Sequence, residues 1–206
     1  EVFRRIAREG RAGFYEGEVA EDMIASLQAL GGTHTLEDLS ATACDYTTPV
    51  SGPYQGVDLV EHPPNGQGAT AILMLNILKH FDLAGMDPFG ASRAHVEAEA
   101  AKLAYDARNR FIADPAFTTR LDHMLAPETA AKLAALIDPK RAQDFGPGHA
   151  PQGGTVYLTA ADESGMMVSF IQSNYMGFGS GIVVPGYGLS LQNRGHGFTL
   201  DESSDN

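Results

Sequence analysis

The chain has 206 residues, of which 43% are hydrophobic, so it can bury the core of one large domain or two small ones and is neither disordered nor fibrous in composition. Its formal net charge of −12 would repel a phosphate backbone, and we therefore expect no nucleic-acid partner. The longest apolar stretch, residues 69–78, is too short to span a bilayer, and no membrane partner is expected. The compartment stays open between cytoplasm and periplasm, because the single Cys44 carries no disulfide signal and is interpreted as a packing residue.

The first part of the chain is predicted to be mainly helical. Apolar residues recur every three or four positions around Val2 and Ile6 and again from Val19 to Leu30, where Gly31-Gly32 ends the helix. Thr35 is predicted to cap the next helix. A strand pair is expected over residues 47–50 and 57–60, followed by helices over 69–81, 92–113 and 127–137.

The composition changes after residue 143. Residues 144–154 contain four glycines and two prolines without hydrophobic periodicity, which indicates a connector. Strands are then predicted over residues 155–161 and 166–173, with a hairpin turn from Asp162 to Gly165, and shorter strands over 182–184 and 189–192. Helices followed by sheet indicate an α+β fold class.

The connector ends in Gly153-Gly154 and runs directly into a strand at Thr155. Glycine tolerates backbone conformations that would let the Thr155 hydroxyl attack the Gly154 carbonyl, and hydrolysis of the resulting ester would free Thr155 as a new amino terminus. A terminal amine has a pKa of roughly 7.7–8, against about 10.4 for lysine, so it can act as the base for its own hydroxyl. Taken alone, however, Gly-Gly-Thr is more often a linker that meets a strand.

Other residues around Thr155 identify a family. The segment from Gly153 to Leu158 resembles the start of the small subunit of gamma-glutamyltranspeptidases. Further matches downstream are Asp162, Gly165, Ser173, Phe178-Gly179-Ser180-Gly181 and Asn193. Upstream, the matches to the large subunit are Phe14-Tyr15-Glu16-Gly17, Gly31-Gly32, Glu37-Asp38-Leu39, Pro63-Pro64 and Leu75-Asn76-Ile77-Leu78. Each piece is weak, but their order along nearly the whole chain is specific.

The resemblance implies a four-layer αββα sandwich of the N-terminal-nucleophile hydrolase type. It divides the chain into a large-subunit-like region, residues 1–154, and a small-subunit-like region, residues 155–206, with cleavage between Gly154 and Thr155. The two halves would then associate as a heterodimer or in a higher oligomer. The chain is expected to start within the large subunit and to stop before the oxyanion-hole loop of the family.

By the same resemblance, Thr155 and Ser173 are the predicted catalytic residues. Ser173 matches a hydroxyl that hydrogen-bonds the nucleophile, although an ordinary strand serine is the alternative. The predicted substrate-binding residues are Tyr175, Ser180, Gly181, Asn193 and Arg194. For the Ser180 segment a simple tight turn, and for Arg194 a surface arginine, remain open.

Three departures from the family pattern bear on the substrate. Gly197 replaces the acidic residue that grips the substrate α-amino group, Tyr175 replaces an asparagine, and Arg194 stands where typical members have an uncharged or acidic side chain. An arginine fork suits a carboxylate. The pattern resembles the acylase-like branch, which includes cephalosporin acylases and an oxamate amidohydrolase.

The resemblance therefore implies an amide hydrolase or acyltransferase that acts on a small-molecule amide, such as a gamma-glutamyl compound. The alternatives are a cephalosporin-acylase-like or oxamate-type amidohydrolase, and a catalytically silent fragment of such an enzyme. No cofactor and no metal are expected, because the seven histidines show no ligand spacing with cysteines or carboxylates.

Overall fold

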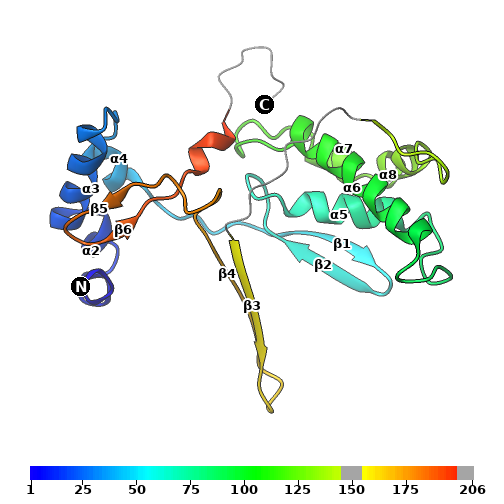
Figure 1. Cartoon of the computed structure of the whole chain (residues 1–206), viewed down its shortest axis with the longest axis horizontal. Coiled ribbons are helices and arrows are strands. Elements are labelled where there is room, and N and C mark those ends of the chain that lie inside the picture. The colour runs from blue at the N-terminus through cyan, green and yellow to red at the C-terminus, as the bar shows by residue number, and fades with distance from the viewer. Residues whose placement is uncertain (145–154, 199–206) are drawn as a thin grey trace. The chain divides into compact units, whose positions relative to one another are not determined.

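The computed structural model describes residues 1–144 and 155–198, which form two compact units (Figure 1). The described part of the first unit comprises residues 1–45 and 155–198, and that of the second comprises residues 46–144. The first unit is therefore assembled from two stretches of sequence that are far apart in the chain. It contains the residues predicted to be functional.

Four helices begin the first unit: α1 (Val2–Glu9), α2 (Ala12–Tyr15), α3 (Gly17–Ala29) and α4 (Leu36–Ala41). The predicted cap at Thr35 is confirmed, because its hydroxyl accepts the N–H of Asp38 while the Asp38 carboxylate accepts the N–H of Thr35. The other end of α4 is held by Arg11, which donates to the carbonyls of Leu39, Ser40 and Thr42. The predicted end of α3 before Gly31 is also confirmed.

The other stretch of the first unit forms two antiparallel hairpins and a turn of 3-10 helix. Strand β3 (Thr155–Ala161) pairs with β4 (Met167–Ser173), and β5 (Val183–Val184) pairs with β6 (Leu189–Ser190) before η1 (Arg194–Gly197). The predicted turn after β3 is confirmed, and the Asp162 carboxylate stabilises it by accepting the N–H groups of Ser164 and Met166. The last two strands are shorter than predicted.

A small apolar core joins the two stretches of the first unit. Val19 and Met23 of α3 are buried against Val184 of β5. Next to this core, the N–H of Gly186 donates to Asp22 Oδ2 over 2.9 Å. The segment that follows β5 is thereby fixed to a helix more than 160 residues earlier in the sequence.

The second unit pairs a hairpin with four helices. Strand β1 (Val50–Tyr54) is antiparallel to β2 (Val57–Glu61), and the helices are α5 (Gly68–Leu78), α6 (Ala91–Phe111), α7 (Leu121–Leu125) and α8 (Pro127–Ala134). The prediction of a strand over 47–50 is wrong. The turn consists of Gln55 and Gly56, which both have positive φ, so Gly52 and Pro53 remain within β1. Helix α7 was not predicted.

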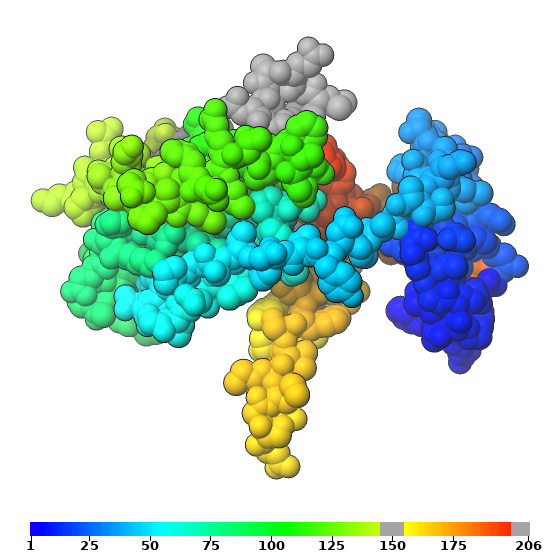
Figure 2. Space-filling model, turned by 180° about the vertical axis from the view of Figure 1, so that it is seen from behind, coloured from blue at the N-terminus to red at the C-terminus, as the bar shows by residue number. Residues whose placement is uncertain are grey.

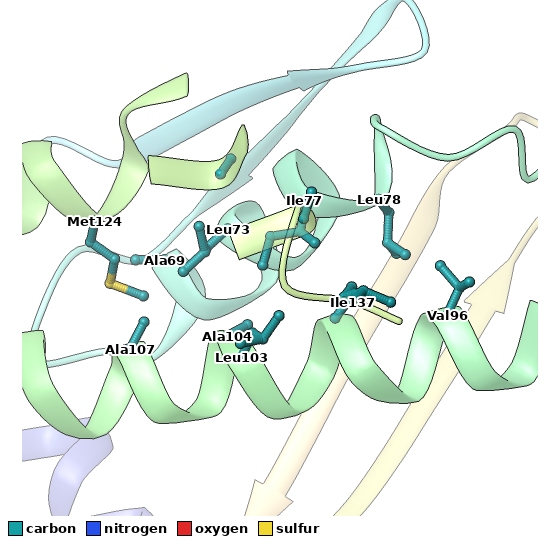
Figure 3. Close-up of a cluster of buried hydrophobic side chains, with 13 residues drawn as sticks. Ala69, Leu73, Ile77, Leu78, Val96, Leu103, Ala104, Ala107, Met124 and Ile137 are labelled. Atoms are coloured by element: carbon teal, nitrogen blue, oxygen red, sulfur yellow. The ribbon is translucent and has the colours of Figure 1, made fainter. Parts of the chain in front are cut away.

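Helices α5 and α6 supply most of the core of the second unit (Figure 3). Leu73 and Ile77 of α5 face Leu103 and Ala104 of α6, and Met124 of α7 closes one end. Small side chains along α6 let α5 approach closely, which is the usual requirement for helices packed without voids. The core explains why the predicted helices over 69–81 and 92–113 appear almost at those bounds.

Strand β1 packs equally closely on α5. A Cβ built on Gly52 would lie 2.4 Å from Cγ2 of Ile72, which is itself buried. We therefore expect Gly52→Ala to lower the free energy of unfolding by about 2 kcal/mol, because the helix and strand must move apart. Urea unfolding measures the change. Ser51→Ala on the exposed neighbouring position is the control and should change the stability by less than about 0.5 kcal/mol.

A buried carboxylate connects α6 to the segment at residue 143. Glu99, only 1% exposed, accepts a hydrogen bond from Lys102 Nζ over 2.6 Å and another from the N–H of Gln143 over 3.0 Å. Lys102 also donates to the carbonyl of Gln143. Burial raises the pKa of the Glu99 carboxyl, but the hydrogen bonds from Lys102 and Gln143 outweigh it and leave this pKa below its ordinary value.

We expect Glu99→Gln to lower the free energy of unfolding by about 2 kcal/mol at neutral pH, because the neutral amide loses the charge-assisted bonds. A carboxyl with a lowered folded pKa stabilises above its unfolded pKa, ordinarily 4.5, and the contribution disappears as the pH falls through the folded value. Urea unfolding at a series of pH values should therefore show that the free energies of unfolding of variant and wild type converge as the pH falls below the folded pKa of Glu99. Glu97→Gln, at a half-exposed position of α6 where the carboxylate pairs with Arg93, is the control and should change the free energy of unfolding by less than about 1 kcal/mol.

The described residues thus form a mixed α+β structure, with three two-stranded antiparallel sheets. The four-layer sandwich and the division at residues 154 and 155 stay predictions. Across residues 1–144 and 155–198, no helix combines the length and apolar character that a membrane span requires.

Candidate active site

Thr155 and Ser173 lie opposite each other at the open end of the β3–β4 hairpin. They are the first residue pair of the ladder, and Thr155 Oγ1 lies 2.8 Å from Ser173 Oγ. Thr155 is exposed and Ser173 is half-buried. The structure therefore brings the two predicted catalytic hydroxyls into direct hydrogen-bonding contact across 18 residues of sequence.

The two faces of this hairpin differ in chemistry. Thr155 shares its face with Tyr157 and Thr159 on β3 and with Ser169 on β4, and Tyr157 Oη lies 3.0 Å from Ser169 Oγ. The opposite face presents Val156, Leu158, Ala160, Val168, Phe170 and Gln172, while Ile171 and Met167 also lie on the Thr155 face. The hairpin, drawn in gold in Figure 2, is exposed along its length. Hydroxyl groups are thus gathered on the face that carries Thr155.

Ser173 is held from two further sides. Its hydroxyl accepts the backbone N–H of Tyr175 over 3.0 Å, and its carbonyl accepts a hydrogen bond from Arg194 Nη2 over 3.2 Å. A hydroxyl that already accepts an N–H is polarised toward donating its own proton. The arrangement therefore favours a hydrogen bond donated by Ser173 to the Thr155 oxygen.

Tyr175 and Arg194 also contact each other. The guanidinium carbon of Arg194 lies 5.7 Å from the centroid of the Tyr175 ring, within the range of a cation–π contact. Tyr175 has φ of 80°, a left-handed conformation that costs a non-glycine residue of order 1–3 kcal/mol. This conformation was not foreseen, although the family's asparagine at this position was a signal, because asparagine tolerates left-handed backbone.

Asn193 supports the loop between β4 and β5. Its Oδ1 accepts the N–H of Met176 over 3.0 Å, and its Nδ2 donates to the carbonyls of Met176 and Gly179. The amide is thus engaged by loop backbone at both ends. Asn193 positions the loop that carries Tyr175, and its predicted contact with substrate stays untested.

The other predicted site residues occupy different places. Ser180 donates to the carbonyl of Leu191 and accepts the N–H of Ile182, so its hydroxyl fixes the loop onto the segment before Asn193. Gly181 is exposed with φ of 75°, which a side chain would strain. Gly154 lies outside the described residues. The structure therefore groups Thr155, Ser173, Tyr175 and Arg194, while Ser180 and Gly181 belong to the surrounding loop.

Metal chemistry receives no support from the described residues. Within residues 1–144 and 155–198, no three histidine, cysteine or carboxylate side chains gather as a metal site would require. The chemistry at hand is that of hydroxyl groups, a backbone amide and a guanidinium.

A threonine at a strand start, in hydrogen-bonding contact with a second hydroxyl, is an arrangement that nucleophilic catalysis could use. The family model described as gamma-glutamyltranspeptidase matches residues 1–206, and the chain belongs to this family.

Two known relatives and one solved structure agree with this family assignment. The chain is 36% identical over 206 residues to the glutathione hydrolase-like YwrD proenzyme of Bacillus subtilis, and 37% identical over 201 residues to the oxamate amidohydrolase proenzyme of Klebsiella pneumoniae. These matches cover 98% and 97% of this chain and 38% of each relative. The crystal structure of cephalosporin acylase from Bacillus halodurans is similar at a TM-score of 0.83 and 40% identity, over 98% of this chain and 37% of that one. The chain thus spans less than two fifths of their lengths.

Proposed function

We propose that this chain forms part of a self-processing amide hydrolase or acyltransferase whose nucleophile is Thr155. The observation that carries the proposal is the 2.8 Å contact between Thr155 Oγ1 and Ser173 Oγ at the first pair of the β3–β4 ladder. A nucleophilic hydroxyl needs a fixed neighbour that orients it and stabilises developing negative charge on its oxygen. Ser173 meets this requirement, because strand pairing and the Tyr175 N–H hold it in place.

Self-processing follows from the position of Thr155 in the chain. Its hydroxyl oxygen attacks the Gly154 carbonyl carbon, the C–N bond breaks, and the Thr155 nitrogen takes up the proton. Water then hydrolyses the ester, which leaves a carboxylate on Gly154 and a free α-amine on Thr155. The free amine, with a pKa of roughly 7.7–8, can remove the proton from Thr155 Oγ1 in later turnovers.

Turnover uses the same oxygen on an external amide. Thr155 Oγ1 attacks the substrate carbonyl, the leaving amine takes the proton from the Thr155 α-amine, and an ester-linked acyl-enzyme remains. Water then releases the acid, or an acceptor amine releases a new amide. Both the proenzyme names of the relatives and their amide-cleaving activities support this class of reaction.

Arg194 favours an acyl group that carries a carboxylate. Its guanidinium lies beside Ser173 and is exposed, and an arginine fork binds a carboxylate through two parallel hydrogen bonds. Gly197, at the end of η1, has no side chain with which to grip an α-amino group. We therefore place the substrate preference with the acylase-like and oxamate-type relatives, and treat gamma-glutamyl amides as the second candidate.

The same proposal includes the architecture and the assembly. The apolar face of the β3–β4 hairpin suits a strand pair in the interior of a four-layer αββα sandwich. After cleavage the fragments that contain residues 1–154 and 155–206 would stay associated as a heterodimer. Interactions such as that of Gly186 with Asp22, which join α3 to the segment after β5, support this association.

The test is the N-terminal sequence of the fragments formed by the purified precursor. One fragment should begin Thr-Val-Tyr-Leu, the sequence that starts at Thr155. An intact wild-type chain after prolonged incubation at neutral pH would contradict self-processing. Hydrolysis rates would then rank the candidate substrates, offered as three anilides: that of glutamic acid linked through its γ-carboxyl, that of glutaric acid and that of oxamic acid. Because Gly197 has no side chain to hold an α-amino group, we expect the γ-glutamyl anilide not to be hydrolysed.

A further inference from the structure

Tyr175 contacts both partners that shape the surroundings of Thr155. Its backbone N–H donates to Ser173 Oγ, and its ring lies beneath the guanidinium of Arg194. Arg194 in turn donates to the carbonyl of Ser173. These three residues form a closed set of contacts around the serine that touches the nucleophile.

The backbone of Tyr175 takes part in this closed set. The Tyr175 N–H points back at the Ser173 hydroxyl two residues earlier, and at φ of 80° the chain changes direction immediately after this N–H. A bulky side chain rarely adopts this conformation without compensating contacts. The Asn193 amide supplies such contacts, because it binds the backbone of Met176 immediately after Tyr175.

Within the part of the chain that the structure describes, the charge of Arg194 is not matched by an acidic side chain. Among residues 1–144 and 155–198, no ion pair includes Arg194; its guanidinium contacts the Ser173 carbonyl and the Tyr175 ring, while its backbone N–H donates to Gln192. By contrast, Arg5, Arg11, Arg93 and Arg110 all pair with carboxylates. An aromatic ring orients a guanidinium while leaving its in-plane donors free for a planar anion.

We propose that Tyr175 is a positioning residue whose ring holds Arg194 in place to receive the carboxylate of an anionic acyl group. The proposal rests on the proposed function of Thr155 and names a determinant of its substrate class. The ring acts on the arginine and the backbone N–H acts on Ser173, so the two roles of Tyr175 can be separated by substitution.

The experiment compares two para-nitroanilides that differ in one group: the glutaric acid mono-anilide, which is anionic, and its terminal amide, which is neutral. Tyr175→Gly keeps the N–H and the left-handed backbone but removes the ring. We expect the ratio of KM for the anionic anilide to KM for the neutral anilide to rise about 5-fold, the worth of an exposed cation–π contact. Tyr175→Phe keeps the ring and should leave that ratio of KM values as it is in wild type.

A second pair of variants isolates the contact. In an Arg194→Gln background, Tyr175→Gly should have no further effect on KM. Tyr105→Leu removes the ring of another tyrosine–arginine pair, in the second unit, and should leave both substrates unaffected. Equal rises of KM for the two anilides, or a Tyr175→Gly effect that persists without Arg194, would overturn the proposal. Calorimetric binding of glutarate to the processed protein should weaken by the same factor, and unchanged binding would also overturn it.

The proposed function fails in a different way. If the wild-type precursor is not cut before Thr155, both the nucleophile assignment and this inference are wrong. If the precursor is cut, and Tyr175→Gly hydrolyses each anilide as well as wild type does, only the role of Tyr175 is wrong.

Discussion

Replacement of Thr155 with alanine is expected to leave the precursor uncut and to lower kcat for amide hydrolysis by about 10⁴-fold or more. The variant has no oxygen to attack the Gly154 carbonyl, so neither the ester nor the free α-amine can form. It loses the nucleophile and the base in one substitution. Mass spectrometry of the purified chain and an anilide assay measure the two effects.

Thr159→Ala is the matched control for this variant. Thr159 lies on the same strand and the same face, four residues further from the open end of the hairpin. It should be processed and active at wild-type level. Thr155→Ser keeps the oxygen and should process slowly, whereas equal processing of Thr155→Ala and wild type would show that another group cuts the chain.

The elements that depend on neighbouring residues were predictable from sequence. The Thr35 cap requires only Asp38 three residues later, and the hairpin turn requires only the Asp162 carboxylate and a glycine at Gly165, whose φ is 85°. Both appear where the sequence placed them. The turn sets the register of β3 against β4 and so places Ser173 opposite Thr155, whereas the roles of the two hydroxyls were implied by the family resemblance.

Contacts between distant residues were not predictable in the same way. The turn at Gln55 and Gly56 displaced the expected strand, since nothing local distinguishes it from a turn at Gly52 and Pro53. The bond of Glu99 to Gln143 spans 44 residues, and the backbone of Met176, just after the left-handed Tyr175, binds Asn193 17 residues further on. These contacts arise from the packing of segments that are far apart in the chain, and local patterns in one sequence do not predict which segments will pack together.

Register has a direct consequence for the chemistry. Because successive strand residues alternate between faces, a slip of one residue would move Ser173 away from Thr155 and bring Gln172 or Asn174 opposite it. Three features constrain β3 and β4 or the segment that follows β4. They are the turn at Asp162, the contacts of Asn193 and the small core at Val184. The site is therefore positioned by parts of the fold that never touch the reacting atoms.

Ser173→Ala is expected to have the second-largest effect, a loss of about 10²-fold in both self-processing rate and kcat. The variant retains Thr155 but removes the hydroxyl 2.8 Å from its oxygen, and it leaves the N–H of Tyr175 without its acceptor. Time courses of fragment formation and anilide hydrolysis measure the two rates. Ser173→Thr restores the hydroxyl and should recover most of both.

Ser169→Ala separates this role from hairpin stability. Ser169 is the next serine on the same face of β4, and its hydroxyl also bonds across the hairpin, to Tyr157 Oη over 3.0 Å. Both variants lose one cross-strand hydroxyl contact of similar length, and Ser173→Ala also loses the acceptor of the Tyr175 N–H, so it should destabilise the fold somewhat more than Ser169→Ala. Because only Ser173 reaches the nucleophile, only its removal should slow the chemistry; equal slowing by both would reduce Ser173 to a structural serine of the strand.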